Sequence, residues 1–575
     1  MTFPPHPAAT DVEFDVRQIP FSYRGAWFDL SPVVGLHQRS ETIHLVSHRN
    51  GMHAVLALQP VANGAPVPAR WTTSSTTLRW TGDDGGTVTA AFEGPHVLRL
   101  RGRGLGLRIV DAASDLTPFT GTYLFTDPVD GTSVFTSYET GRRYRLTRVS
   151  GALQVVGAEA LGAADRAVVA GANGGDWELA IQETTAGALP FTPHSPFPAV
   201  VAAADAAFRD YLDAVAPWRD ERTPAAALAA YVLWSATVAP EGFLGRESVL
   251  MSKHWMDKVW SWDHCFNALA LAPGLPDAAL DQFLAPFDHQ DPTGALPDSV
   301  THSEILFNYV KPPIHGWALN RLRGLSTREL ADTELREIHD RVAAWTRFWL
   351  VQRRRPGHVL PFYQHGNDSG WDNSTTFDRD RVIESPDLAA FLVLQLETLA
   401  DLATELGLPA EEWKHERDSV LRALTTDLWR DTEFVAVGAL SGNDSTATSL
   451  LNLLPLVLGE RLPDRVRQLL ADRLIAHLTE HGLATEPPTS PRYEADGYWR
   501  GPIWAPSTAL IEDGLRSSGF TQLADEVSSR FRALCERSGF AENFDALTGA
   551  GLRDRAYTWT AAVYLMFAAD HVRRI

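Results

Sequence analysis

Cysteine and long apolar runs are both scarce in this 575-residue chain. Only Cys265 and Cys535 occur, each within an apolar stretch, so we expect two buried free thiols and no disulfide framework. No run of about 18 apolar residues is present, which excludes a transmembrane helix. The first residues have neither a basic n-region nor an apolar h-region, so we expect no secretory signal and, by default, a cytoplasmic location.

Basic residues are also in the minority. Lys and Arg total 51 against 71 for Asp and Glu, which gives a formal net charge of −20. Such a surface repels phosphate backbones and no basic stripe offsets it, so nucleic acid is excluded as a partner. The hydrophobic share of 45% indicates a globular protein, and the length predicts two domains. The oligomeric state is not indicated.

The first third of the chain has the pattern of β-strands. Short alternating or apolar runs are separated by turn clusters such as residues 82–86, 130–131 and 171–175. We therefore expect an N-terminal antiparallel β-sandwich over residues 1–195, ended by the proline-rich stretch 189–198. The predicted strands include residues 42–46, 54–58, 87–92, 97–100 and 122–125.

The rest of the chain has helical periodicity. We expect a linker with a helix over residues 196–222 and a catalytic domain over 223–575. Thirteen helical segments are one linking helix plus twelve, and twelve helices joined as successive hairpins predict an (α/α)6 toroid. The predicted helices are 199–216, 224–238, 263–273, 277–287, 313–324, 328–353, 386–406, 409–428, 446–457, 462–480, 503–518, 521–538 and 556–570.

Four expected loops mix aromatic residues with charged or amide groups: residues 253–264, 363–375, 497–504 and 540–549. A glycosidase needs this combination, because one carboxylic acid must protonate the leaving oxygen and another carboxylate must activate water or attack the sugar. Flat aromatic rings pack on the C–H faces of sugars, and the chain contains 18 Trp. The structural alternative is that large chains bury Trp in their cores.

These loops carry a specific resemblance. Residues 369–374, SGWDNS, resemble the general-acid motif of glycoside hydrolase families 63 and 37. Residues 498–504, YWRGPIW, resemble the segment that these enzymes place against the sugar in the −1 subsite, and residues 542–549, ENFDALTG, resemble their general-base loop. Residues 260–263, WSWD, resemble a further sugar-binding motif. The resemblance covers roughly residues 225–575, in the family's order.

The resemblance implies an inverting exo-acting α-glycosidase with Asp372 as general acid and Glu542 as general base. Such an enzyme is expected to act on small α-glucosides or α-mannosides, with an α-glucosidase favoured, and to need no cofactor. Inversion requires carboxyl groups roughly 6.5–9.5 Å apart. Substrate-binding residues are expected to be Trp262, Asp263, Lys311, His315, Gln364, Trp371, Asn373, Trp499, Arg500 and Trp504.

Several of these residues have structural alternatives. Asp372 could be a turn residue, Asp263 a helix cap, and Arg500 an ion-pair partner, while Glu542 could cap the final helix or pair with Arg553. The histidines do not show metal-ligand spacing, so no metal site is expected. Two other functions stay open: a phosphate-dependent disaccharide phosphorylase and a non-catalytic carbohydrate-binding protein.

Overall fold

The computed structural model describes residues 11–574 except 114, 115, 118, 159–164, 188 and 190. The chain divides into two compact units. The first consists of Met1–Pro217, Ala230–Asp257 and Thr301–Glu304, and the second of Trp218–Ala229, Lys258–Val300 and Ile305–Ile575. The domain limits expected from the sequence stay a prediction.

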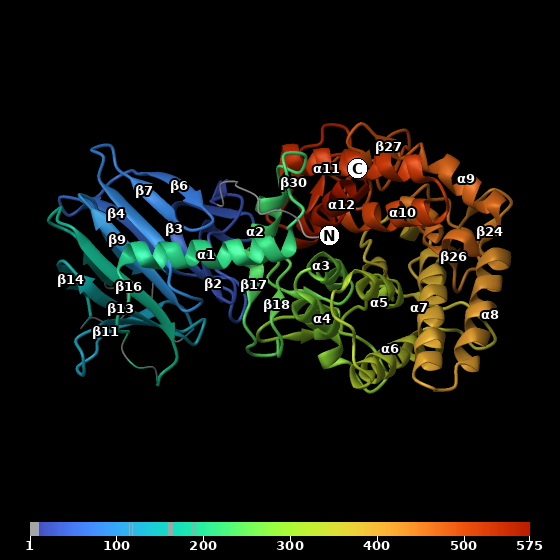
Figure 1. Ribbon diagram of the computed structural model, residues 1–575, viewed down its shortest axis with the longest axis horizontal. Coiled ribbons are helices and arrows are strands. Elements are labelled where there is room, and N and C mark those ends of the chain that lie inside the picture. The colour runs from blue at the N-terminus through green and yellow to red at the C-terminus, as the bar shows by residue number, and fades with distance from the viewer. Residues whose placement is uncertain are drawn as a thin grey trace. The chain divides into compact units, whose positions relative to one another are not determined.

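The first unit contains two antiparallel sheets (Figure 1). The nine-stranded sheet has the order β1-β6-β7-β8-β9-β16-β13-β12-β11, and the seven-stranded sheet has the order β14-β15-β10-β4-β3-β2 with β5 beside β4. The strands of the first sheet are Glu13–Phe14 (β1), Arg70–Ser74 (β6), Leu78–Thr81 (β7), Thr87–Phe92 (β8), Val97–Arg103 (β9), Thr122–Thr126 (β11), Ser133–Ser137 (β12), Arg143–Ser150 (β13) and Trp177–Thr184 (β16). Those of the second are Phe28–Gly35 (β2), Gln38–Ser47 (β3), His53–Ala62 (β4), Ala65–Pro66 (β5), Gly106–Asp111 (β10), Leu153–Val156 (β14) and Ala167–Ala170 (β15).

Alternation of buried and less buried residues explains the strands. In β7, Leu78 and Trp80 are buried while Arg79 is exposed, and buried residues of both sheets form one hydrophobic cluster. The predicted turn at residues 82–86 is closed by a hydrogen bond from the Gly82 amide to the Gly86 carbonyl (2.9 Å). Sequence pattern therefore located the strands whose buried faces contribute to this shared core.

The helices follow the sheets. Each of the thirteen predicted helical segments overlaps a helix in the described part of the chain. They are Phe197–Val215 (α1), Ala226–Ala236 (α2), Asp263–Leu271 (α3), Pro276–Leu284 (α4), His315–Leu325 (α5), Asp332–Gln352 (α6), Pro386–Glu405 (α7), Glu411–Asp427 (α8), Leu450–Arg461 (η4), Asp464–Leu474 (α9), Ala505–Ser517 (α10), Thr521–Ser538 (α11) and Thr558–Arg574 (α12).

One predicted segment, residues 446–457, differs from expectation. It forms the 3₁₀ helix η4, which contains Pro455 and a kink at Gly459, where φ is +53°. A proline inside a helix lacks the N–H that an α-helical hydrogen bond requires, and its ring clashes with the preceding turn. The apolar residues of this segment are nevertheless buried, so burial preserved the helical pattern while proline changed the helix type.

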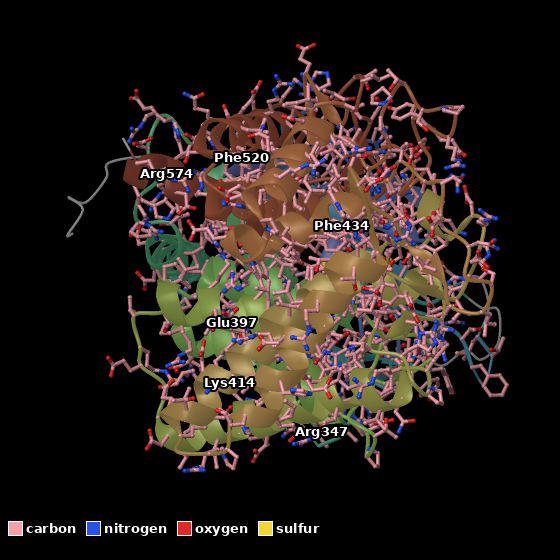
Figure 2. All side chains as sticks on the ribbon, turned by 90° about the vertical axis from the view of Figure 1, so that its right-hand side faces the viewer. Arg347, Glu397, Lys414, Phe434, Phe520 and Arg574 are labelled. Atoms are coloured by element: carbon pink, nitrogen blue, oxygen red, sulfur yellow. The ribbon has the colours of Figure 1, made fainter. Side chains whose placement is uncertain are left out.

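In the second unit, six helices contact one another in a closed cycle: α3, α5, α7, η4, α10, α12 and α3 again. Helices α3 and α7 are buried along most of their length. Helix α6, in contrast, buries only one face. Figure 2 shows the charged side chains of Arg347 on α6, Glu397 on α7 and Lys414 on α8. Glu397 pairs with Arg461 at 2.6 Å.

The two thiols are as expected: Cys265 and Cys535 are both buried and free. Among residues 11–574, outside the short gaps given above, no helix combines the length and apolar character that a bilayer span needs.

Short two-residue strands connect the helices and matter for the site. Those used below are Val259–Trp260 (β19), Ser299–Val300 (β20), Ile305–Leu306 (β21), Asn543–Phe544 (β29) and Gly551–Leu552 (β30).

A buried polar cluster ties residues 230–257 to the sheets within the first unit. The His48 ring lies between two carboxylates, with Nε2 2.8 Å from Asp29 Oδ2 and Nδ1 3.2 Å from Asp257 Oδ2. Burial disfavours the imidazolium, but the hydrogen bonds and charges of Asp257 and Asp29 outweigh it and raise the pKa of His48. Nearby, the Lys253 ammonium donates to Ser22 Oγ (2.9 Å) and the Ala26 carbonyl (2.6 Å).

We predict that His48→Ala lowers the free energy of unfolding by about 3 kcal/mol, since it leaves two buried carboxylates without their shared cation. Because the folded-state pKa is raised, the contribution of His48 is present below its unfolded pKa and is lost as pH rises through the folded value. Denaturant unfolding of wild type and variant at a series of pH values measures both effects. His53→Ala is the matched control, and an equal loss in both variants would contradict the prediction.

Candidate active site

Three of the four aromatic and polar loops are joined by hydrogen bonds in the second unit, which also contains residues 258–264 of the first loop. The third and fourth are joined by backbone pairing: the Ile503 amide donates to the Phe544 carbonyl (2.7 Å) and the Phe544 amide to the Ile503 carbonyl (3.0 Å). The second and third are joined by Asn373, whose Nδ2 donates to the Gly497 carbonyl (3.0 Å) and whose Oδ1 accepts from the Trp499 amide (3.0 Å). Segments more than a hundred residues apart are thus held by direct hydrogen bonds.

Tyr498 connects the two carboxyls that were expected to be catalytic. Its hydroxyl donates a hydrogen bond to Glu542. Burial raises the pKa of Tyr498 well above its usual value, and the charges of Glu542 and Asp372 raise it further. The backbone of Tyr498 has φ +64°, a left-handed conformation that non-glycine residues seldom adopt.

Glu542 is buried and follows α11. Burial raises its pKa to about 8 and the charge of Asp554 adds to this, against the Tyr498 hydrogen bond and the charge of Arg553. Its Oε1 atom has no hydrogen-bond partner within the part of the chain that the structure describes. The structural alternatives for Glu542 do not apply, because α12 begins only at Thr558 and Arg553 pairs with Asp496 (2.7 Å).

Arg553 supports Tyr498 from the other side. Its guanidinium lies over the Tyr498 ring, 4.9 Å from the centroid, and its Nη1 donates to Asn543 Oδ1 (3.0 Å). Like Tyr498, Arg553 has a left-handed backbone, with φ +58°. A cation over an aromatic face is attracted by the ring's electron density, so Arg553 holds the ring that carries the hydroxyl.

Asp372 is partly accessible and adjoins a charged cluster. Burial raises its pKa and the charge of Asp298 contributes, while the charges of Lys311 and His365 act in the opposite direction. Lys311 is buried, forms an ion pair with Asp298 (2.6 Å) and donates to the Asn367 carbonyl (2.9 Å). A raised pKa suits a carboxyl that must carry a proton near neutral pH.

Asp263 occupies the first turn of α3, where the helix dipole favours a carboxylate. Burial nevertheless raises its pKa to about 8, with Lys311 opposing and the charges of Asp298 and Asp372 adding to the shift. Its Oδ2 has no hydrogen-bond partner among the described residues, and its side chain does not cap the helix. A buried, unpartnered carboxyl oxygen is costly, and a ligand hydroxyl would satisfy it.

The predicted tryptophans pack on one another. Trp371 lies 4.7 Å from Trp499, which stacks on Trp504 at 4.0 Å with an interplanar angle of 6°. Trp559 continues the series, at 5.6 Å from Trp504 and 5.8 Å from Trp262. At most 2% of the surface of Trp262, Trp371, Trp499 and Trp504 is exposed. These rings therefore have almost no free face, and they form one packed wall of aromatic side chains.

The remaining predicted residues have different surroundings. Arg500 is held by Asp378 (2.8 and 3.0 Å) and Glu494 (3.4 Å), the ion-pair alternative named above. His315 is buried and donates from Nε2 to the Ser261 carbonyl (2.9 Å), and burial lowers its pKa to about 4. Gln364 and Asn373 are exposed.

Sequence reasoning missed Tyr498, Asp298 and Arg553 as site residues. Tyr498 is the first residue of the motif at residues 498–504, so the sequence already pointed to its position. Asp298 precedes β20, which pairs with both β19 and β21, and this pairing brings it to Lys311 from a segment with no distinguishing pattern.

Comparisons with known proteins identify the family of the helical part of the chain. A model of the mannosylglycerate hydrolase MGH1-like glycoside hydrolase domain matches residues 256–560, more than half of the chain. The chain belongs to this family. It is a glycoside hydrolase of the family 63 type, which confirms the resemblance read from the four loops.

Individual relatives match a little more than half of the chain. A mannosylglycerate hydrolase of Thermus thermophilus is 26% identical over 54% of this chain and 93% of its own length. A glucosylglycerate hydrolase of Mycolicibacterium hassiacum is 24% identical over 60% of this chain and 97% of its own.

Two solved structures are similar in fold. A family 63 mannosylglycerate hydrolase of Thermus thermophilus in complex with glucose has a TM-score of 0.53 at 24% identity, over 59% of this chain and 98% of its own. A bacterial glucoamylase complexed with acarbose has a TM-score of 0.59 at 11% identity, over 98% of this chain and 96% of its own. The glucoamylase match therefore extends over the sheet-rich part that the hydrolase match leaves out.

Gly370, within the general-acid motif, packs against the residue that precedes α3. A Cβ at Gly370 would lie 2.5 Å from Cζ2 of the buried Trp262, and its φ is +73°. We predict that Gly370→Ala lowers the free energy of unfolding by about 1–3 kcal/mol more than Gly357→Ala, because the clash adds to the backbone cost. Gly357 is the control, since its φ is +80° and nothing lies within 4 Å. Equal losses of unfolding free energy in chemical denaturation would mean that Trp262 moves aside without cost, and would contradict the prediction.

Proposed function

We propose that this glycoside hydrolase cleaves small α-glucosides or α-mannosides with inversion at the anomeric carbon. The observations that support the proposal are the raised pKa values of Asp372 and Glu542 and the hydrogen bonds that join both of their loops to residues 497–504. Asp372 is the general acid that protonates the glycosidic oxygen. Glu542 is the general base, and its unpartnered Oε1 accepts a proton from water on the opposite face of the sugar.

The remaining residues bind and position the substrate. Asp263 Oδ2, Asn373 and Gln364 supply oxygen and amide groups to sugar hydroxyls, whereas the Trp wall excludes water and keeps the carboxyl pKa values raised. Tyr498 fixes the orientation of the base. The charge of Lys311 is already balanced by Asp298, so Lys311 acts on the pKa of Asp372 rather than on an anionic aglycone.

The fold proposed for this site is the (α/α)6 barrel. The closed cycle of contacts among α3, α5, α7, η4, α10 and α12 supports it, as does the burial of α3 and α7. The four loops precede or follow helices of this cycle: residues 253–264 lead into α3 and residues 497–504 into α10. In a barrel, such loops meet at one end of the inner ring, where a substrate can enter.

Mannosylglycerate and glucosylglycerate are the first substrates to test, because two relatives bear these names. We expect NMR of fresh reaction mixtures to show the β-anomer of the released sugar with wild type. Glu542→Gln should lower turnover by at least about 10²-fold, since proton transfer from water is lost. Glu494→Gln is the control, because Glu494 is exposed and pairs with Arg500 on the same loop.

Release of the α-anomer would contradict inversion. Turnover only in the presence of inorganic phosphate would identify a phosphorylase, and binding without turnover of any α-glucoside or α-mannoside would identify a carbohydrate-binding protein.

The assignment of acid and base has its own test. An α-glycosyl fluoride needs little protonation of its leaving group, so Asp372→Asn should still hydrolyse it with the base alone. A base acts when deprotonated, and the pKa of Glu542 is raised to about 8, so turnover of the fluoride by Asp372→Asn should rise as pH increases through about 8. Stopped-flow or fluoride-electrode rates from about pH 5 to 9.5 measure this. Retention of fluoride hydrolysis in Glu542→Gln and its loss in Asp372→Asn would reverse the two roles.

A further inference from the structure

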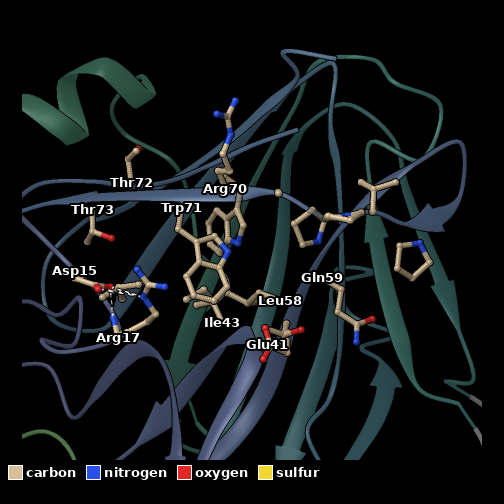
Figure 3. Close-up of a pocket in the computed structure, with 18 of the residues that line it drawn as sticks. Asp15, Arg17, Glu41, Ile43, Leu58, Gln59, Arg70, Trp71, Thr72 and Thr73 are labelled. Atoms are coloured by element: carbon tan, nitrogen blue, oxygen red, sulfur yellow. Dashed lines mark hydrogen bonds and ion pairs between the residues drawn. The ribbon is translucent and has the colours of Figure 1, made fainter. Parts of the chain in front are cut away.

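A second concave site lies in the first unit. It is a cavity of about 1090 Å³ bounded by β1, β3, β4, β6 and β7, so strands of both sheets contribute to it (Figure 3). Its apolar lining includes Ile43 and Leu58, which face each other across β3 and β4, and Trp71 and Trp80, which face each other across β6 and β7. The volume is at the upper end of the range for small-molecule sites, enough for several sugar rings.

The two tryptophans differ in exposure. Trp71 is half-buried and packs against the sheet core, so part of its ring faces the cavity. Trp80 is completely buried, yet its indole Nε1–H has no hydrogen-bond partner within residues 11–574 as far as the structure describes them. A buried N–H without an acceptor is sensitive to its surroundings, and Trp80 lines the cavity directly behind its cross-strand partner Trp71, so a ligand seated on Trp71 changes the environment of this N–H.

The rim of the cavity carries both acidic and basic side chains. Figure 3 shows Glu41 and Gln59 on one side of Trp71 and Arg70 above it. Glu41 and Arg70 are exposed and make no side-chain hydrogen bond or ion pair that the described residues record, whereas Asp15 is bound by Arg17 (2.9 and 3.1 Å). Three acidic and two basic side chains line the cavity, so it favours a neutral ligand over an ion.

We infer that this cavity is a second carbohydrate-binding site, which holds a neutral oligosaccharide apart from the catalytic carboxyls. A flat, partly exposed indole beside carboxylate, amide and guanidinium groups is the combination that recognises a pyranose, because the ring packs on the C–H face and the polar groups meet the hydroxyls. A saccharide that packs on Trp71 lies next to Trp80, which faces Trp71 across β6 and β7. The site binds without cleavage and would raise the local concentration of saccharides for the enzyme.

The first test uses the Trp80 N–H as a local probe. In ¹⁵N-indole NMR of the full chain carrying Glu542→Gln, the Trp80 resonance is identified by its disappearance in Trp80→Phe. Maltotetraose and an α-linked mannotetraose are then titrated. We expect at least one of them to shift the Trp80 resonance saturably, and an unmoved resonance with both would overturn the proposal.

The second test measures affinity by calorimetry on the same full-length background. Trp71→Ala should weaken binding of the shifting saccharide at this site at least about tenfold, and Glu41→Ala or Arg70→Ala, which change only exposed rim groups, about threefold. Tyr123→Ala is the matched control, since Tyr123 is a half-exposed aromatic residue on β11, at the far edge of the same sheet. Equal dissociation constants in wild type and in both the Trp71 and rim variants would overturn the proposal. The calorimetric and NMR outcomes do not depend on which carboxyl is the acid.

Discussion

Two backbone hydrogen bonds between Ile503 and Phe544 are the interaction on which the active site depends. They fix residues 497–504 against the loop that carries Glu542, and the Tyr498 hydroxyl of that segment donates to the Glu542 carboxylate. Asn373 then ties the general-acid loop to the same segment. The loops that carry Asp372 and Glu542 are therefore held together by one main-chain pairing and by the side chain of Asn373.

Desolvation is the second constraint, and it acts on every carboxyl of the site. Burial is the largest cause of the raised pKa of Asp263, Asp372 and Glu542. Lys311 and Arg553 limit the shift without removing it, because Lys311 is shared with Asp298 and Arg553 with Asp496. The packed Trp rings maintain the low polarity that produces these shifts. Their contribution is thus electrostatic as well as steric.

Much of the fold could be predicted from periodicity, and less of the site. Helix α7 was predicted almost to its ends, because Ser385 and Pro386 mark its start and Gly407 follows its last residues. The segment 446–457 was predicted to be helical and forms a 3₁₀ helix. Its apolar residues are buried as the pattern predicted, but Pro455 lacks the N–H that a regular α-helix requires. Asp372 and Glu542 could be found from their motifs. Asp298 could not, because its place beside Lys311 results from the pairing of short strands and has no local signal.

The left-handed backbones of Tyr498 and Arg553 have a consequence for protein engineering. Replacing non-glycine residues at positive φ with glycine is a common route to thermostability, and His37 and Asn63, with φ of +56° and +51°, are suitable positions in this chain. At 498 and 553 the same replacement would relax the backbone but remove the hydroxyl and the cation that support Glu542. Under the proposed function, stability and activity are therefore coupled at these two residues, and a stabilised variant must leave both of them unchanged.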